Sequence, residues 1–179
     1  SFPIICCILR LPELAGIPMA ALTHSEKVRL VDKMCTHITH GAIQGIRLES
    51  IDKEELTLRL PYRPELVGNP DTGVIYSGVL TLLLDQALGI AGLCCDEVGA
   101  RVTATLDLRI DHLGVAPAGH DIFASARVYR STRRVLFVEG AAFCESRDRP
   151  VARATGSWVL RGEFDPDASV ASVRGAASP

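Results

Sequence analysis

Residues 75–95, IYSGVLTLLLDQALGIAGLCC, decide the fold, because these 21 residues contain a single charged side chain, Asp85. The run is too long for a strand and has no polar face, which favours a helix buried among other elements. A transmembrane helix is the rival interpretation, since about 20 apolar residues cross a bilayer. A central aspartate would cost on the order of 3 kcal/mol in lipid, so we expect the buried helix of a soluble protein.

Four segments of alternating polarity follow this helix. In residues 103–113, Leu106, Leu108 and Ile110 alternate with polar side chains, the period of two that is typical of a half-buried strand. Residues 121–130, 134–145 and 151–161 continue the pattern, and the polar breaks between them predict hairpin turns. We therefore expect an antiparallel meander that curves around the helix.

Upstream of the helix, Thr23 and Glu26 form a capping-box pattern, and apolar residues recur at helical spacing from there to Gly41. Residues 43–48 and 56–60 read as a strand pair, and the Pro- and Gly-rich residues 61–73 predict a long irregular loop. These elements and the meander predict one α+β domain over residues 23–162. Residues 1–22 are interpreted as a packed N-terminal extension, and the Ala-, Ser- and Asp-rich residues 163–179 predict a disordered tail.

Composition limits the partners. A net charge of -2 and a pI near 6.2 give no global field to attract nucleic acid or an anionic membrane, and we expect neither. The six cysteines include no Cys-x-x-Cys spacing, so neither a zinc site nor a disulfide framework is indicated, and a cytoplasmic location is expected. His37 and His40 lie three residues apart without a third ligand nearby, so no metal is expected either.

Asp85 is the chemical anomaly of the long helix, because a buried carboxylate is disfavoured unless it is paired. One interpretation is structural: Asp85 bonds a neighbouring group. The other is catalytic, since the unpaired N–H groups at Ser77 and Gly78 favour the negative charge that a carbonyl develops under attack. Asp85 follows Ser77 by eight residues, about 12 Å along the axis. An antiparallel second helix would bring the two groups together.

Residues 67–79, VGNPDTGVIYSGV, with Asp85 resemble the Asn, Gly, His-Gly-Gly, Asp pattern of the phenylacetate-pathway (PaaI-type) hot-dog thioesterases. Residues 102–113 are similar to that family's third strand, 112–119 to the loop after it, and 151–156 to its closing strand. The resemblance covers about residues 43–160. It implies a hot-dog fold, with an antiparallel sheet wrapped around a long central helix, and the hydrolysis of acyl-CoA without a cofactor.

The resemblance also implies roles for four residues. Asp85 would be the general base or the nucleophile, and the N–H of Ser77 would polarise the thioester carbonyl. Thr105 would position the attacking water, and Asn69 would hold substrate or water. These four would meet at the interface of a homodimer, or of a homotetramer built from dimers.

Tyr76 and Ser77 depart from the family pattern, which has His and Gly there. The backbone N–H survives, but the new side chains occupy space beside Gly78 where an acyl group would approach. A non-catalytic acyl-CoA binder or sensor is therefore the alternative function. Arg133 and Arg134 lie at a predicted turn and suit the phosphates of CoA, although a solvated hairpin tip is the commoner reason for an arginine at such a turn.

Overall fold

The computed structural model describes residues 23–53, 55–98 and 101–160. Its helices are α1 (His24–His37), α2 (Thr39–Gln44) and α3 (Ser77–Ala91), with 3-10 turns η3 (Pro64–Leu66) and η4 (Gly92–Cys94). Its strands are β1 (Arg47–Asp52), β2 (Glu55–Leu60), β3 (Val67–Asn69), β4 (Val74–Ile75), β5 (Val102–His112), β6 (Ile122–Ser131), β7 (Val135–Phe143) and β8 (Ala152–Leu160). Strands β3 and β4 form a separate small hairpin.

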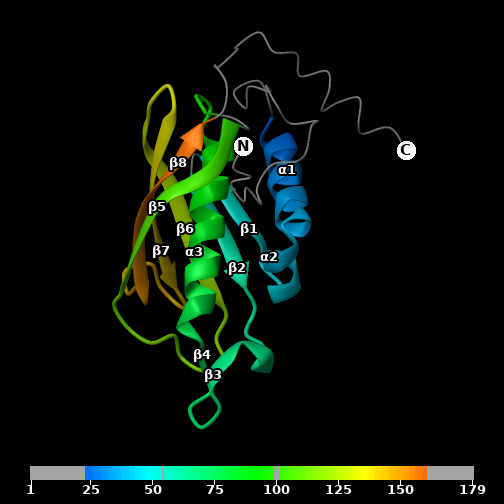
Figure 1. Cartoon of the computed structure of the whole chain (residues 1–179). Helices are drawn as coiled ribbons and strands as arrows, with labels where there is room; N and C mark the ends of the chain where they lie inside the picture. Colours follow the sequence, from blue (N-terminus) through cyan, green and yellow to red (C-terminus); the bar gives the residue numbers. More distant parts are fainter. Residues whose placement is uncertain (1–22, 54, 99–100, 161–179) are drawn as a thin grey trace, which may run out of the picture.

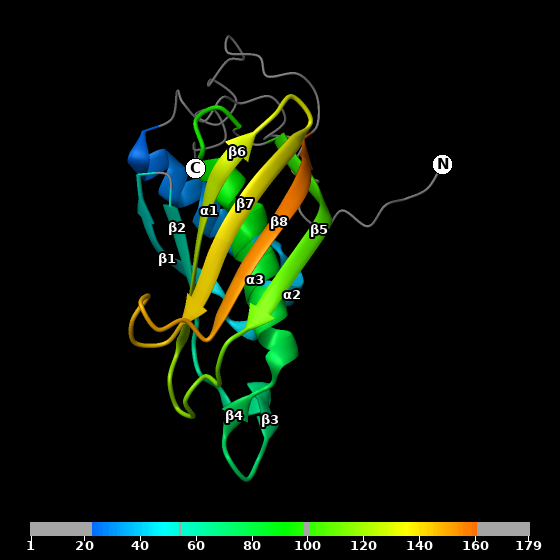
Figure 2. The same cartoon turned by 90° about the vertical axis from the view of Figure 1, so that its left-hand side faces the viewer.

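The main sheet has six antiparallel strands in the order β1-β2-β6-β7-β8-β5. Helix α3 lies along its inner face, and α1 packs on the same side beside β1 (Figure 1). The outer face of the sheet is turned toward the viewer in Figure 2, with α3 behind the strands. The arrangement confirms the predicted α+β fold with a long central helix.

Small residues on the inner face let α3 approach the sheet closely. Ala152, Ala154 and Gly156 of β8 are buried and alternate with more exposed residues. At Gly140 of β7, an added Cβ would lie 2.5 Å from the carbonyl oxygen of Ser125 and 2.7 Å from a methyl of Leu88 on α3. A larger residue there would have to push the helix away from the sheet.

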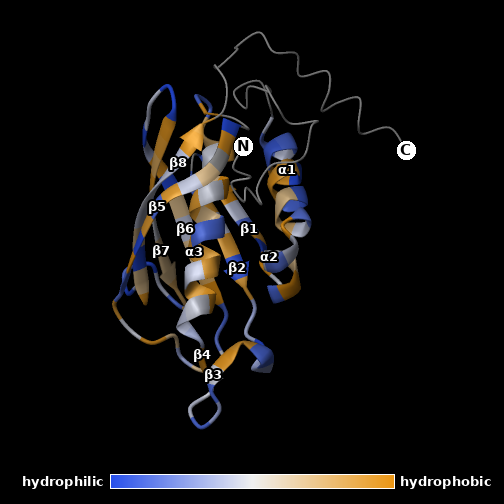
Figure 3. Cartoon of the chain, viewed as in Figure 1, coloured by the Kyte–Doolittle hydropathy of each residue, from blue (hydrophilic) through white to orange (hydrophobic). Residues whose placement is uncertain are grey.

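Helix α3 is white to orange along most of its length, with one hydrophilic stretch near its middle (Figure 3). Its leucines that face the sheet, such as Leu83, Leu84 and Leu88, are fully buried. Helix α3 is shorter than the helix predicted over residues 75–95. Residues 74–75 form β4, and the chain tightens into the 3-10 turn η4 after Ala91. The described chain also leaves one face of α3 open, where Tyr76, Ser77 and Thr81 are exposed.

The expected boundaries upstream of α3 are partly wrong. The first helix breaks at Ile38, whose φ of -73° and ψ of 91° end α1 before α2 begins. Residues 43–44 belong to α2, so the first strand starts later, at Arg47. The predicted loop over residues 61–73 contains the 3-10 turn η3 and strand β3.

The window Ser77–Cys94 is long and apolar enough to cross a membrane by length and composition alone. In this structure 67% of that window is buried inside the fold, as it would be for a core helix. The proposed N-terminal extension over residues 1–22 and the tail over residues 163–179 lie outside the described residues.

Candidate functional site

Asp85 and Thr105 meet on the open side of the helix. Helix α3 turns the half-buried carboxylate of Asp85 toward β5, where the Thr105 hydroxyl donates a hydrogen bond of 3.0 Å to Asp85 Oδ1. Burial raises the pKa of the Asp85 carboxyl above its ordinary value, and the bond from Thr105 partly offsets that rise. The chain therefore holds a proton-accepting group beside a hydroxyl at a partly exposed surface.

Trp158 forms an apolar wall beside this pair. The register of β5 and β8 places Trp158 directly opposite Thr105, so both side chains project from the same face of the sheet and lie within contact distance. The indole is fully buried, and its Nε1 has no hydrogen-bond partner among the described residues. Sequence reasoning missed this residue, although its position in a predicted strand was the available signal.

The start of α3 offers backbone donors. No described acceptor bonds the N–H groups of Ser77 and Gly78, and the N-cap residue Tyr76 makes no side-chain cap bond. The Tyr76 ring is 63% exposed and lies over Gly78, since a Cβ added at Gly78 would collide with it. The helix start is thus open to an incoming carbonyl, with one aromatic ring beside it.

Asn69 uses its side chain within its own turn. Its Oδ1 accepts a hydrogen bond of 3.0 Å from the N–H of Asp71, and its carbonyl accepts one of 2.9 Å from the N–H of Gly73. Gly73 has a φ of 68°, in the left-handed region that favours glycine. Asn69 therefore shapes the β3–β4 hairpin, and one chain does not bring it to Asp85.

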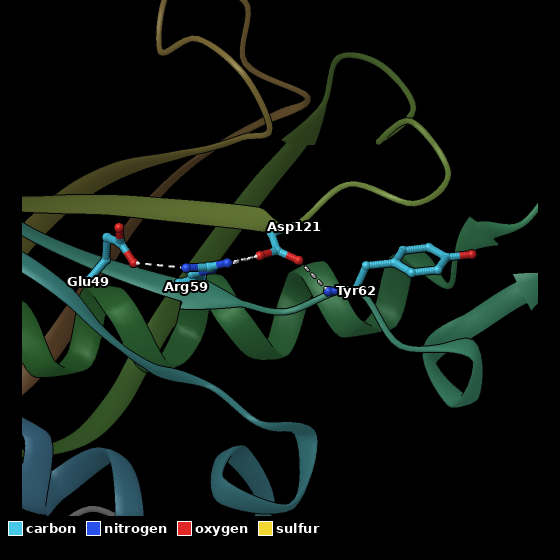
Figure 4. A network of polar contacts seen from close by, with 4 residues as sticks. All are labelled: Glu49, Arg59, Tyr62 and Asp121. Atoms are coloured by element: carbon cyan, nitrogen blue, oxygen red, sulfur yellow. Dashed lines mark hydrogen bonds and ion pairs between the residues drawn. The ribbon is translucent and has the colours of Figure 1, made fainter.

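A polar network that sequence reasoning missed anchors this hairpin (Figure 4). Asp121 accepts hydrogen bonds of 2.7 Å from the N–H of Tyr62 and from Nε of Arg59. The Tyr62 hydroxyl then donates to the Gly73 carbonyl at 2.9 Å, and Glu49 lies 3.8 Å from the Arg59 guanidinium. The Tyr62 N–H is the main reason that the pKa of Asp121 is lowered. The network ties β2 and β6 to the segment that leads into α3.

Arg133 and Arg134 are exposed at the turn between β6 and β7. This turn lies at the opposite end of the molecule from the β3–β4 hairpin (Figures 1 and 2). Arg101 donates a hydrogen bond of 2.9 Å to the Arg133 carbonyl, which adds a third guanidinium to that end. Within one chain, the two arginines are therefore remote from Ser77.

The comparisons with known proteins agree with this geometry. The model of the thioesterase superfamily matches residues 72–151, which include α3 and Thr105. No curated protein matches the chain significantly.

Within the described part of the chain, no three His, Cys, Asp or Glu side chains are grouped to hold a metal ion.

Three solved structures illustrate the similarity. A protein from Pseudomonas aeruginosa is 32% identical, with a TM-score of 0.68, and the match covers 75% of this chain and 99% of that one. Zebrafish thioesterase superfamily member 2 is 16% identical, with a TM-score of 0.64 over 79% of this chain and all of its own. The PaaI protein from the phenylacetic acid degradation operon of E. coli is 17% identical, with a TM-score of 0.63 over 79% of this chain and 99% of its own. By fold and by sequence, the chain belongs to the thioesterase superfamily and has the hot-dog architecture.

Proposed function

We propose that this protein hydrolyses acyl-CoA thioesters to a free acid and CoA, with Asp85 as the general base or nucleophile. The observation that carries the proposal is the hydrogen bond between Thr105 and Asp85 on the open side of α3. A carboxylate with a raised pKa, held beside a hydroxyl, is suited to take a proton from water. Membership of a superfamily of thioester hydrolases supports the same reaction.

In the base mechanism, Thr105 and Asp85 orient a water molecule, and Asp85 accepts its proton as the oxygen attacks the thioester carbonyl carbon. The negative charge that develops on the carbonyl oxygen is stabilised by the Ser77 N–H at the helix start. Collapse of the tetrahedral intermediate breaks the carbon–sulfur bond, and the departing thiolate takes up the proton. In the nucleophile mechanism, an Asp85 oxygen attacks the carbonyl carbon and CoA leaves as the thiolate; water then hydrolyses the resulting anhydride, which releases the free acid and restores Asp85.

The site requires two chains, because Ser77 and Asp85 are about 12 Å apart along one helix. Two features support a homodimer: the open face of α3, and the edge strand β5 with Leu106 57% exposed. An antiparallel second copy would place its helix start beside this chain's Asp85. Pairing of dimers into a homotetramer and a cytoplasmic location stay predictions.

The CoA moiety would extend toward Arg133 and Arg134 of the second copy, whose guanidinium groups suit its phosphates. Their position at the end of the molecule remote from Ser77 fits this arrangement, since an antiparallel partner reverses the direction of the sheet. Tyr76 and Gly78 would border the acyl group. The Asn69 side chain is hydrogen-bonded within its own turn, so it would contribute to the site by shaping the β3–β4 hairpin that precedes α3.

A non-catalytic acyl-CoA binder is the second candidate. The exposed Tyr76 ring over Gly78 favours it, because the ring narrows the approach to the helix start. Wild-type protein that binds acyl-CoAs without releasing free thiol would support this function.

Substitution of Asp85 by Asn tests the proposed reaction. We expect Asp85→Asn to abolish release of free CoA thiol from a panel of short, long and aromatic acyl-CoAs, because the amide cannot accept the proton. Thiol release is followed with a chromogenic disulfide reagent, and circular dichroism and sedimentation check that the variant stays folded and dimeric. Full activity in a folded Asp85→Asn variant would exclude Asp85 from the chemistry.

A further inference from the structure

The outer face of the sheet, away from α3, carries its side chains in rows that cross β2, β6 and β7. The register gives three such rows: Arg59, Phe123 and Phe143; Thr57, Ser125 and Ala141; Glu55, Arg127 and Glu139. The middle row consists of short side chains between two rows of long ones. This difference in length produces a hollow of about 430 Å³, which continues to Arg153 and Thr155 on β8. Its volume is in the range of small-molecule sites.

The carboxylates that line the hollow are already neutralised. Arg127 donates a hydrogen bond of 2.8 Å from Nε to Glu139 Oε1. Arg147 forms an ion pair with Glu55 and donates a hydrogen bond of 2.9 Å to the Thr57 hydroxyl. The hollow thus contains no uncompensated negative charge among these residues.

Two groups in the hollow lack a partner. The exposed guanidinium of Arg153 has no ion pair or hydrogen bond to the described residues, and it is the lining cation left uncompensated. Ser125 is 8% exposed, and its hydroxyl likewise bonds to no described residue. This hydroxyl is not among the enclosed side-chain atoms that lack a partner, so it is accessible from the hollow, where a ligand oxygen that accepts its hydrogen bond would replace water.

Ala141 lies between these two groups, paired in register with Ser125 on one side and Arg153 on the other. The two residues are therefore two strand spacings apart, about 10 Å between backbones. An arginine side chain spans much of that gap, and the methyl of Ala141 forms the floor. The remaining space suits a small planar anion that contacts both groups.

We propose that this hollow is a second binding site, which takes a small organic carboxylate. The carboxylate accepts hydrogen bonds from the Arg153 guanidinium, whose planar fork matches it, and from the Ser125 hydroxyl. The short apolar remainder of the ligand lies against Ala141. The site is on the opposite face of the sheet from α3, so binding there is independent of Asp85 and of the proposed hydrolysis.

Methyl NMR of the intact protein, labelled with ¹³C at alanine methyls, tests the proposal with butyrate as the probe. We expect a saturable shift of the Ala141 methyl, and an affinity at least about tenfold lower in Arg153→Gln, the usual effect of losing a hydrogen bond to a charged group. Arg149→Gln is the matched control: Arg149 is also exposed but lies outside the hollow, and its variant should bind as wild type does. Asp85→Asn should also bind butyrate normally.

Filling the hollow provides a second variant that leaves every charge in place. Because Ala141→Leu removes the reporting methyl, binding is then followed at the methyls of Ala126 and Ala154, which also line the hollow. Their response to butyrate in the wild type should be abolished in Ala141→Leu without a change in the sedimentation coefficient. Equal affinities of wild type and Arg153→Gln, or no saturable shift, would overturn the proposal. A changed oligomeric state in Ala141→Leu would also overturn it, because the face would then be an interface between copies. Tighter binding of inorganic phosphate than of butyrate would contradict a site built for planar carboxylates.

Discussion

Asp85 is subject to two opposing influences: burial raises the pKa of its carboxyl, and the hydrogen bond from Thr105 lowers it. A raised pKa in the folded chain means that the protonated form is favoured there more than in the unfolded chain. The stabilising contribution of the Asp85 carboxyl to the folded state is therefore fully present below the ordinary aspartate pKa of 3.8, and it is lost as pH rises through the folded pKa. The same titration would set the acid limb of a rate profile.

Replacement of Thr105 by Val should move that acid limb to higher pH. Valine keeps the shape of the side chain but removes the hydrogen bond that holds the pKa of Asp85 down, so the base stays protonated over a wider range. The measurement is the pH dependence of kcat/KM for an acyl-CoA substrate. Thr105→Ser keeps the hydroxyl and should retain the wild-type profile; identical profiles for wild type and Thr105→Val would mean that another group titrates.

At the scale of elements, the β3–β4 hairpin positions the start of α3, and the Tyr62 hydroxyl fastens that hairpin through Gly73. Tyr62→Phe should destabilise the fold by about 1 kcal/mol and lower kcat/KM about tenfold, because the Ser77 N–H would be held less firmly. Chemical denaturation and steady-state kinetics measure the two effects, and the pH profile should not move.

Tyr129→Phe is the matched control, since Tyr129 is 54% exposed on β6 and lies outside the network. An unchanged kcat/KM in Tyr62→Phe would show that the hairpin holds its place without this bond.

The long elements were predictable from the sequence, and the short ones were not. The apolar run around Asp85 and the alternation in residues 103–113 are strong local signals, so both α3 and β5 were expected, and β5 was expected to within one residue at each end. The break at Ile38 follows from backbone angles that no pattern of polarity reports.

The residues of the candidate site were likewise predictable only where a local sequence signal exists. The resemblance pointed to Asp85 and Thr105, which the fold brings together. The contacts of Tyr62 with Asp121 and the position of Trp158 beside Thr105 join residues about 60 and 50 positions apart. Such contacts depend on strand order and register, which one sequence does not encode locally.

At the scale of the whole molecule, the edge of the sheet is the feature that supports the proposed homodimer. Strand β5 is the last strand in the sheet order, and Leu106 on it is 57% exposed. A charge at this position should oppose burial against a partner. We expect Leu106→Lys to dissociate the proposed dimer and to abolish thiol release, although Asp85 and Thr105 are untouched.

Sedimentation equilibrium measures the association, and Ile43→Lys serves as the control because Ile43 is 66% exposed on α2, away from this edge. A Leu106→Lys protein that remains dimeric and active would place the interface elsewhere.

Trp158 has a spectroscopic consequence, because it is the one tryptophan of the chain and is fully buried opposite Thr105. Its fluorescence comes from a single, known environment, and indole emission responds to a charge or a ligand close by. Excitation of the intact protein therefore reads the surroundings of Asp85 without an added label. The protonation of that carboxyl, and the arrival of an acyl chain beside it, can be followed as changes in the colour and intensity of one emitter.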